Sequence, residues 1–309
     1  MDWTALPPGL RSGVEERLGG PVVRVDGTVG GFSVGFAGVV RTARRAVFVK
    51  ATSEAVNSHG RALYNQEWHA CRVLARNVVA DGPPGDARNG RADGAAPRPG
   101  PGAGLGHESS ESVPSFDPGF EWGFDWGKWT VLAFRAVDAD ICSPSWPYEQ
   151  LEGVLRHLRA CRSAAPDGLP PLDAYFGEAF SAWAALAADP SFDGWPTDDG
   201  GNALLPVREW LALSERARRA FAGDQLLHAD LRADNILWTG GAPVLVDWAY
   251  ACRGAAVFDP LYLLLEVAYR RAAPPEDALA RVLQAYGCPS GDANALLAVF
   301  GGWFTWMAR

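Results

Sequence analysis

The sequence predicts an α+β fold, with a small antiparallel sheet in its first part and a larger, mostly helical second part. Short apolar runs separated by glycines occupy residues 21–51 and 120–134, a pattern typical of strands and hairpins. From Pro147 onward, apolar residues recur at helical spacing. Residues 226–248 interrupt the helices with two short apolar runs around Gly240-Gly241, which predicts one further hairpin.

The first part is expected to hold the sheet and one helix beside it. Before the sheet, Pro7-Pro8 and Gly19-Gly20 bound a short helix over residues 7–18. A second helix is expected over residues 63–74, where Leu63, Ala70 and Leu74 face inward. The strand patterns cover residues 22–25, 46–50, 120–124 and 129–134.

Residues 79–113 differ in composition from the rest of the first part. They are rich in Gly, Pro, Ala and Ser and contain few large apolar side chains. Such a segment buries too little area to offset its chain entropy. We therefore expect a disordered insertion here, with the sheet resuming after it.

The second part is expected to consist mainly of helices. Asp259 is expected to cap one of them, with Pro260 at its first position. The last helix is strongly apolar and stops close to residue 309, so we expect further sequence or a partner to cover it. The predicted helices are residues 147–158, 172–188, 205–221, one starting at Asp259-Pro260, 275–286 and 292–307.

Composition excludes several classes of protein. The 309 residues carry a net charge of −8, which argues against a nucleic-acid-binding surface. The longest uncharged stretch, residues 293–308, is shorter than the ~20 apolar residues of a membrane-spanning helix. The five cysteines are scattered, which indicates reduced thiols. We predict a cytoplasmic protein with no membrane or nucleic-acid partner, and the oligomeric state stays open.

The predicted hairpin brings oxygen-bearing side chains together. It places Asn235, at the start of one strand, close to Asp247, at the end of the other, and Asp230 lies just upstream. Hard cations such as Mg²⁺ prefer these oxygen ligands and keep positions open for phosphate oxygens. The sequence therefore predicts a magnesium site at one end of the hairpin.

The pattern His228-x-Asp230, Asn235 and Asp247-Trp248 resembles the catalytic and metal-binding segments of the protein-kinase-like fold. It is most similar to the aminoglycoside phosphotransferase family of small-molecule kinases, although Ala229 stands where that family has glycine. The resemblance implies a bilobal protein-kinase-like fold. Residues 1–137 would form a nucleotide-binding lobe, and residues 138–309 a helical lobe for catalysis and substrate binding.

The resemblance also implies roles for these residues. Asp230 would orient the acceptor hydroxyl and accept its proton, and Asn235 and Asp247 would hold Mg²⁺. Besides its expected role as a cap, Asp259 would brace the catalytic loop, as an aspartate at this position does in the resembled family. Lys50, at the end of an apolar strand, would contact the α- and β-phosphates, and Glu67 in the following helix would hold it there. A surface lysine and a solvated glutamate are the alternative interpretation of the last two.

Further nucleotide contacts rest on the same resemblance. The backbone at Gly31, Ser33 and Gly35 would cover the phosphates, although glycines here also suit simple turns. Arg135 and Val137 fall where the kinase-like fold joins its lobes and binds adenine, mainly through the backbone.

The implied activity is transfer of the γ-phosphate of Mg-ATP, with GTP as an alternative donor, to a hydroxyl of a small molecule. Only eleven residues separate Asp247 from Asp259, which leaves no room for a protein-kinase activation segment. The acidic balance favours an aminoglycoside acceptor, to which four loop acids could contribute unless they are simply solvated. Choline, homoserine, a sugar or a macrolide are alternative acceptors, and a nucleotide-binding pseudokinase scaffold is the alternative of another class. The loop acids are Asp189, Asp193, Asp198 and Asp199.

Overall fold

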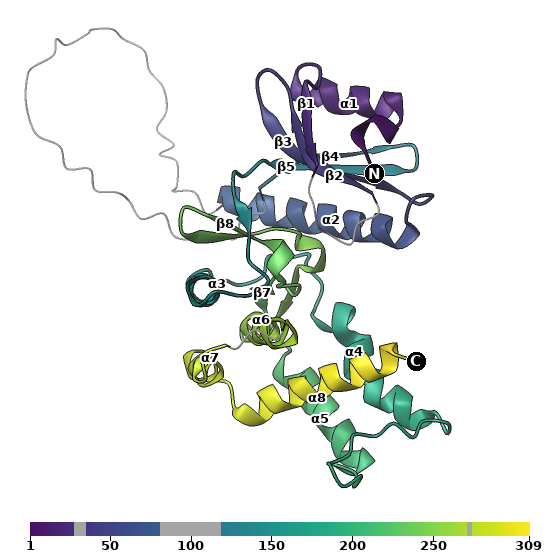
Figure 1. Ribbon diagram of the computed structural model, residues 1–309, viewed down its shortest axis with the longest axis vertical. Coiled ribbons are helices and arrows are strands. Elements are labelled where there is room, and N and C mark those ends of the chain that lie inside the picture. Colours follow the sequence, from purple (N-terminus) through teal and green to yellow (C-terminus); the bar gives the residue numbers. More distant parts are fainter. Residues whose placement is uncertain (28–34, 81–118, 271–273) are drawn as a thin grey trace, which may run out of the picture.

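A five-stranded antiparallel sheet forms the first part of the computed structural model, and helices form most of the rest (Figure 1). The structure describes residues 1–27, 35–80, 119–270 and 274–309. The predicted fold class is confirmed. The expected disordered insertion lies outside the described residues from residue 81 onward, and residues 79 and 80 belong to a helix instead.

The sheet has the strand order β1-β2-β3-β5-β4, with every neighbouring pair antiparallel. The predicted turn between β4 and β5 contains Gly127 at φ +58°, a backbone conformation that glycine adopts without strain. The elements of this part are η1 (Trp3–Ala5), α1 (Pro8–Leu18), β1 (Arg24–Gly27), β2 (Phe36–Arg41), β3 (Ala46–Ser53), α2 (Ser58–Ala80), β4 (Phe120–Trp126) and β5 (Trp129–Arg135).

The two faces of the sheet pack against different helices. Side chains of a strand alternate between faces, so Val47 and Val49 of β3 point one way and Phe48 and Lys50 the other. Val47 and Val49 pack in one cluster with Leu10 and the rest of the apolar face of α1. Phe48 joins the main core, together with residues of α2. This alternation places Lys50 on the α2 side of the sheet.

The second part contains two small sheets among its helices. The predicted hairpin is present as β8 and β9, and Gly240 and Gly241 in its turn have φ +57° and +81°. The elements are β6 (Asp140–Ile141), α3 (Tyr148–Ala160), α4 (Asp173–Ala188), α5 (Val207–Ala220), β7 (Gln225–Leu227), η2 (Ala233–Asn235), β8 (Ile236–Thr239), β9 (Ala242–Leu245), η3 (Trp248–Tyr250), β10 (Cys252–Gly254), α6 (Phe258–Tyr269), α7 (Ala278–Tyr286) and α8 (Ser290–Met307).

Two short strand pairings hold the segment from β7 to β10, which contains the predicted site residues Asp230, Asn235 and Asp247. Strand β7 pairs with β10, which brackets the segment, and β6 adds a third strand beside β8. Helix α2 packs against η3, so the segment also contacts the first part of the chain. The hairpin is therefore fixed from both sides.

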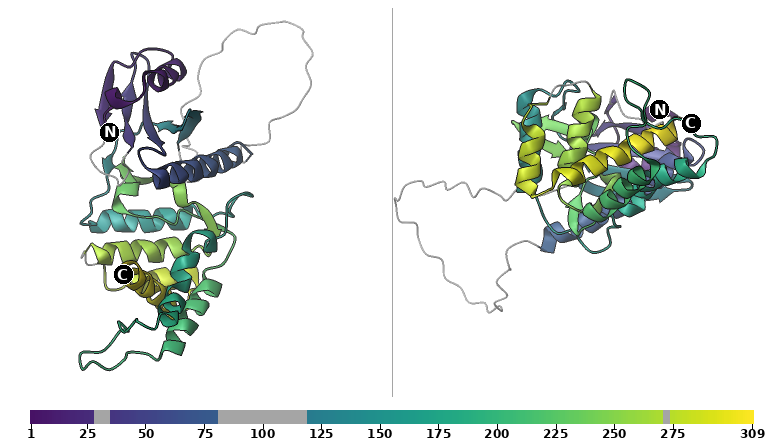
Figure 2. Two further views of the ribbon diagram at one scale, coloured as in Figure 1. Left: turned by 90° about the vertical axis from the view of Figure 1, so that its right-hand side faces the viewer. Right: turned by 90° about the horizontal axis from the view of Figure 1, so that it is seen from below.

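Helices α4, α5 and α8 pack together at the end of the molecule opposite the five-stranded sheet (Figures 1 and 2). Trp183 of α4 stacks between Trp195 and Trp210 and donates a hydrogen bond to the Ala298 carbonyl, 2.7 Å away. A side chain at Gly302 of α8 would collide with the Trp183 ring, so the close approach of α4 and α8 requires glycine there. No helix in the described ranges combines the length and apolarity that a bilayer crossing requires.

Candidate active site

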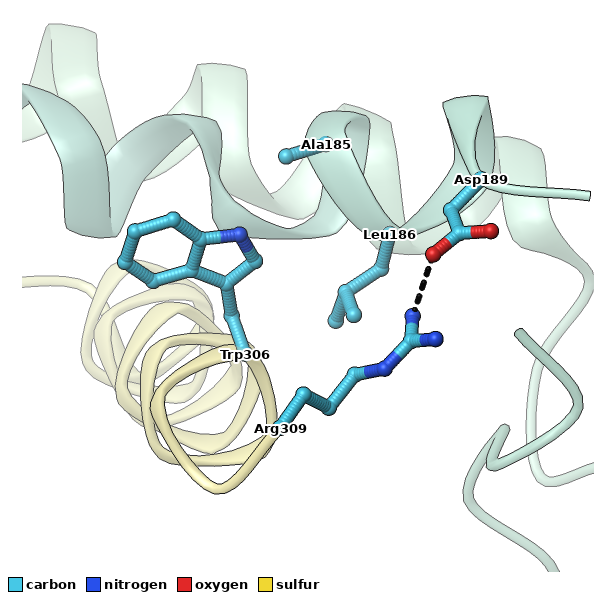
Figure 3. A pocket seen from close by; sticks show the side chains of 5 residues that line it. All are labelled: Ala185, Leu186, Asp189, Trp306 and Arg309. Atoms are coloured by element: carbon cyan, nitrogen blue, oxygen red, sulfur yellow. Dashed lines mark ion pairs between the residues drawn. The ribbon is translucent and has the colours of Figure 1, made fainter. Parts of the chain in front are cut away.

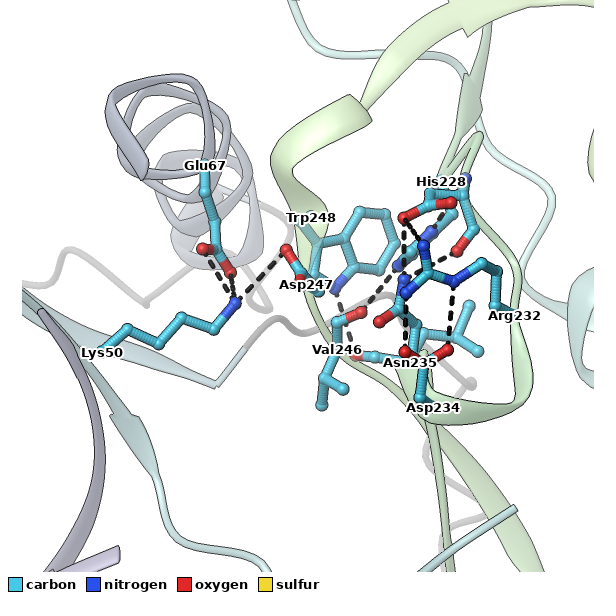
Figure 4. A network of polar contacts seen from close by, with 11 residues as sticks. Lys50, Glu67, His228, Arg232, Asp234, Asn235, Val246, Asp247 and Trp248 are labelled. Atoms are coloured by element: carbon cyan, nitrogen blue, oxygen red, sulfur yellow. Dashed lines mark hydrogen bonds and ion pairs between the residues drawn. The ribbon is translucent and has the colours of Figure 1, made fainter. Parts of the chain in front are cut away.

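The buried lysine of the sheet meets carboxylates from two other elements (Figure 4). Lys50 Nζ on β3 lies 2.9 Å and 3.0 Å from the two carboxylate oxygens of Glu67 on α2. It also lies 3.2 Å from Asp247 Oδ1, just beyond β9. Lys50 is 9% exposed and Glu67 1%, so the surface-lysine and solvated-glutamate alternatives are wrong.

Ion pairing with two carboxylates keeps the buried Lys50 side chain charged. Burial alone lowers the pKa of Lys50, but Asp247 and Glu67 outweigh it and hold that pKa above its ordinary value. Burial raises the pKa of Glu67 to about 7, against the attraction of Lys50. The Trp248 backbone N–H also donates to the Glu67 carboxylate, which ties α2 to the segment that carries Asp247.

Asp230 and Asn235 are joined at the other end of the site. Asn235 Nδ2 donates to the Asp230 carbonyl oxygen and to Asp230 Oδ2, both at 2.9 Å. The Asp230 side chain is 17% exposed, and this burial raises its pKa to about 6, while nearby Arg232 acts in the opposite direction. A carboxylate held in this way suits proton acceptance near neutral pH.

The backbone turns sharply at Asp247 to present its side chain. Asp247 has φ +66°, which aspartate tolerates better than most residues, and its side chain is 41% exposed. One residue earlier, the Val246 N–H donates to the Asn235 carbonyl at 2.9 Å. Asn235 and Asp247 therefore sit at the same end of the hairpin, as the sequence predicts.

His228 stabilises the loop that carries Asp230 through two hydrogen bonds of its ring. Its Nε2–H donates to the Val246 carbonyl at 2.9 Å, and its Nδ1 accepts from the Asp230 N–H at 3.3 Å. Burial lowers the pKa of His228, which keeps the ring neutral in this tautomer. The ring packs 4.7 Å from the Trp248 ring, between centroids. His228 thus links the loop that carries Asp230 to the chain just after β9, and its side chain is buried.

Asp259 does not cap α6, and that prediction is wrong, but it braces the loop that carries His228 and Ala229, as the resemblance implies. Val257 is the cap residue, and Asp259 lies in the first turn with its side chain buried. Its two carboxylate oxygens accept the backbone N–H groups of His228 at 2.8 Å and Ala229 at 2.9 Å. Those two N–H groups are buried and need an acceptor, which explains why the carboxylate turns away from its own helix.

Ala229 has a backbone conformation that glycine adopts without strain. Its φ is +60°, in the left-handed region, which costs an L-residue about 1–2 kcal/mol. The side chain is fully enclosed, and the Asp259 hydrogen bond holds the backbone in place. The loop therefore keeps its conformation without the glycine.

The donor set fits a hard divalent cation. The Asn235 amide nitrogen is used by Asp230, which leaves its carbonyl oxygen as a ligand, and Asp247 adds a carboxylate. Among the described residues, no three His, Cys, Asp or Glu gather into a metal cage. Mg²⁺ favours a coordination shell with one or two protein oxygens, in which phosphate oxygens and water fill the remaining positions.

The other predicted nucleotide residues are only partly described. Gly31 and Ser33 lie outside the described residues. Gly35 is buried beside β3, where a Cβ would collide with the Ala51 carbonyl oxygen. Arg135 ends β5, and Val137 lies in the connection to β6. Strand β5 pairs with β3, the strand that carries Lys50.

Sequence reasoning missed three side chains around Asp230. Arg232 lies inside the motif itself, 4.0 Å from Asp230. Tyr250 of η3 and Tyr262 of α6 lie near enough that the charge of Asp230 adds to burial in raising the pKa of each phenol. The sequence could have indicated Arg232, because it lies between the motif residues Asp230 and Asn235. Tyr262 comes close to Asp230 only through the packing of α6, which no short sequence pattern indicates.

The loop acids and the surface hollows lie away from this site. Asp189 pairs with Arg309 at 2.8 Å, and Asp198 bonds within its own loop, at the far end of α4 and α5 (Figures 1 and 2). Two hollows of about 300 and 480 Å³ occur beside α4 and α8, and Figure 3 shows the smaller one. The loop acid Asp189 lines the smaller hollow, and neither hollow is lined by a predicted catalytic, nucleotide-binding or metal-binding residue.

Comparison with known proteins identifies the family. A family model described as the phosphotransferase enzyme family matches residues 130–298. The chain belongs to this family. Membership confirms the resemblance and the predicted enzyme class, a phosphotransferase with an alcohol group as acceptor. Among curated proteins, no sequence matches the chain.

Solved structures of phosphotransferases share the fold. A thermostable mutant of aminoglycoside phosphotransferase APH(4)-Ia, in ternary complex with AMP-PNP and hygromycin B, is 16% identical, with a TM-score of 0.52 over 97% of this chain and 91% of that chain. The apo form of a thermostable mutant of the same enzyme is also 16% identical, with a TM-score of 0.50 over 96% of this chain and 91% of that chain. At this identity the likeness shows the fold alone.

Proposed function

We propose that the protein transfers the γ-phosphate of Mg-ATP to a hydroxyl group of a small molecule. The observation that carries this proposal is the 3.2 Å contact between Lys50 Nζ and Asp247 Oδ1. It joins a buried cation of the sheet to the segment between β7 and β10, which also carries Asp230 and Asn235. The relative crystallised with AMP-PNP supports an adenine nucleotide as donor, and GTP is the alternative donor.

Asp230 is the group that acts on the acceptor. Its Oδ2 is held by Asn235, and within the described residues no hydrogen bond engages its Oδ1. The acceptor hydroxyl would bind at Oδ1 and pass its proton there as it attacks the phosphorus. Catalysis then consists mainly of positioning and charge stabilisation.

The nucleotide would be bound by the Lys50 side chain and by a metal ion. Lys50, held by Glu67, would contact the α- and β-phosphates. Asn235 and Asp247 would hold Mg²⁺, which when bound offsets the charge of the β- and γ-phosphate oxygens. The division into lobes at residue 137, the adenine contacts of Arg135 and Val137, and the cytoplasmic location stay predictions.

Two acceptor classes follow from different observations. The relative bound to hygromycin B supports an aminoglycoside. However, two carboxylates of this region already form ion pairs, Asp234 with Arg232 at 2.6 Å and Glu266 with Arg270 at 2.8 Å. Acids tied to arginines are poor partners for additional ammonium groups. This pairing favours a neutral hydroxylated acceptor, such as a sugar, as the second candidate.

The test is a panel of aminoglycosides, sugars and other alcohols, with ATP or GTP and Mg²⁺, followed through nucleoside diphosphate release. We expect one acceptor class to stimulate release, and Asp230→Asn to abolish transfer while it keeps nucleotide binding. Wild-type turnover in Asp230→Asn would contradict the mechanism. Nucleotide binding with no transfer and no slow ATP hydrolysis would indicate a pseudokinase scaffold instead.

A further inference from the structure

Helix α8 exposes an uncharged apolar face at the end of the molecule opposite the five-stranded sheet (Figures 1 and 2). Its inner face, with Leu296, Val299 and Phe300 buried, packs on α4 and α5. On the outer face, Leu297 is 46% exposed and Phe304 is 59% exposed. Large apolar side chains that are exposed together on one face indicate a contact surface.

Gly301 lies in the middle of this outer face, between Leu297 and Phe304. A Cβ at Gly301 would meet no described atom within 4 Å beyond its own turn of the helix. Glycine weakens a helix interior relative to alanine, so a glycine there calls for a packing reason. The neighbouring Gly302 has one in the Trp183 ring, whereas the described chain supplies none for Gly301. A close approach by another molecule would supply it.

A groove runs beside Gly301, between α8 and α5. It is the larger hollow, of about 480 Å³. Gly301 and Thr305 of α8 lie on one side, and Trp210 and Leu213 of α5 lie on the other. None of the described residues that line it is charged. The groove therefore gives a second helix room to approach α8 at Gly301 without burying an unpaired charge.

The outer face is self-complementary about Gly301. Leu297 precedes Gly301 by four residues and Phe304 follows it by three, so both lie on the same face of the helix, about one turn from the glycine. In an antiparallel crossing of two α8 helices at Gly301, Leu297 of each copy meets Phe304 of the other copy. Such reciprocal contacts are what a two-fold axis requires.

Charged groups flank this face at its two ends. Residues 293–308 contain no charged side chain. Near the start of α8, Asp292 pairs with Arg216 at 2.6 Å, and beyond its end Arg309 pairs with Asp189 at 2.8 Å. An antiparallel crossing brings the first ion pair of one copy level with the second ion pair of the other copy, so that opposite charges can alternate. An apolar centre with a charged rim is typical of protein interfaces.

We propose that the outer face of α8 binds a second copy of this chain, in a two-fold dimer whose α8 helices cross antiparallel at Gly301. Glycine at the crossing lets the two backbones approach closely, and two Leu297–Phe304 contacts flank it. The inference does not depend on the proposed function, because its test measures association and not activity.

Sedimentation equilibrium of the purified chain measures the Kd of the dimer. We expect the wild type to dimerise, and Phe304→Glu to raise the Kd about a hundredfold, because the two-fold axis introduces the change twice and a central aromatic contributes about tenfold each time. The matched control is Tyr148→Glu. Tyr148 lies on α3, outside this face, and is 60% exposed, so its replacement should leave the Kd unchanged.

Gly301→Leu distinguishes a specific crossing from general apolar association. A Cβ at Gly301 meets nothing in the described chain outside its own helix turn, so the Tm of the monomer should not fall. An additional leucine would strengthen association through a merely apolar surface. In the proposed dimer it holds the two helices apart, and the Kd should rise by about tenfold or more.

Cross-linking tests the position of the axis. Gly301→Cys should give a disulfide-linked dimer on mild oxidation, because the two copies of this residue meet at the crossing. Thr305→Cys should not, because each cysteine would lie about 6 Å along its helix from the axis, on opposite sides of it, beyond the reach of a disulfide.

A wild type that stays monomeric at its highest soluble concentration would overturn the proposal and leave the face to another protein or to an apolar ligand. A wild-type Kd in Phe304→Glu, or a tighter dimer in Gly301→Leu, would overturn it too. Equal cross-linking of Gly301→Cys and Thr305→Cys would refute the antiparallel crossing on which the proposal rests.

Discussion

Removal of the Asp259 carboxylate should weaken both the fold and the catalytic loop. In Asp259→Ala, the backbone N–H groups of His228 and Ala229 lose their acceptors in a buried environment. Each unsatisfied buried N–H costs about 1–3 kcal/mol, so the free energy of unfolding should fall by about 4 kcal/mol. At about 2 °C per kcal/mol for a chain of this size, Tm should fall by about 8 °C.

Asp259→Asn retains one oxygen and should lose about half as much stability, because its NH₂ group meets one of the two donors. The control is Asp224→Ala, which removes an exposed carboxylate that pairs with Arg253 and should cost about 1 kcal/mol or less. Chemical and thermal unfolding measure both changes. If Asp259→Ala unfolds like Asp224→Ala, the carboxylate does not hold the loop and the reasoning is refuted.

Three further predictions concern the site. Because burial raises the pKa of Asp230 to about 6, the carboxylate protonates below that pH, and kcat/KM should fall about tenfold per pH unit there; a flat profile down to pH 5 would contradict its role as base. Glu67→Gln should raise the nucleotide KM about tenfold and lower unfolding stability by about 3 kcal/mol, since it removes one partner of a buried ion pair. In Ala229→Gly, relief of the positive φ is offset by lost methyl burial and greater chain entropy, so denaturant unfolding should differ from wild type by no more than about 1 kcal/mol.

The residues that local pattern and spacing could predict are those on regular elements. Strand alternation fixes the face of Lys50, and the two glycines of the hairpin turn fix how Asn235 meets Asp247. The helix that carries Glu67 follows from its apolar spacing. These positions depend on a few neighbouring residues, so the sequence specifies them directly.

Other features depend on contacts between distant segments. Local rules match Asp259 to a helix cap, and only the family resemblance implied its bonds to backbone groups about 30 residues earlier. Strands β7 and β10 have three residues each and form only because the segment between them folds back. The sequence predicts α1 as a helix but says nothing of which sheet face it covers. Short sequence patterns contain no information on such pairings.

The most direct test of a single nucleotide site built from both halves of the chain is calorimetric binding of Mg-AMP-PNP to wild type, Lys50→Met and Asp247→Asn. We expect the wild type to bind only with Mg²⁺, and each substitution to weaken binding at least tenfold although the two positions lie almost 200 residues apart. Wild-type affinity in both variants, or no binding by the wild type, would contradict the existence of that site.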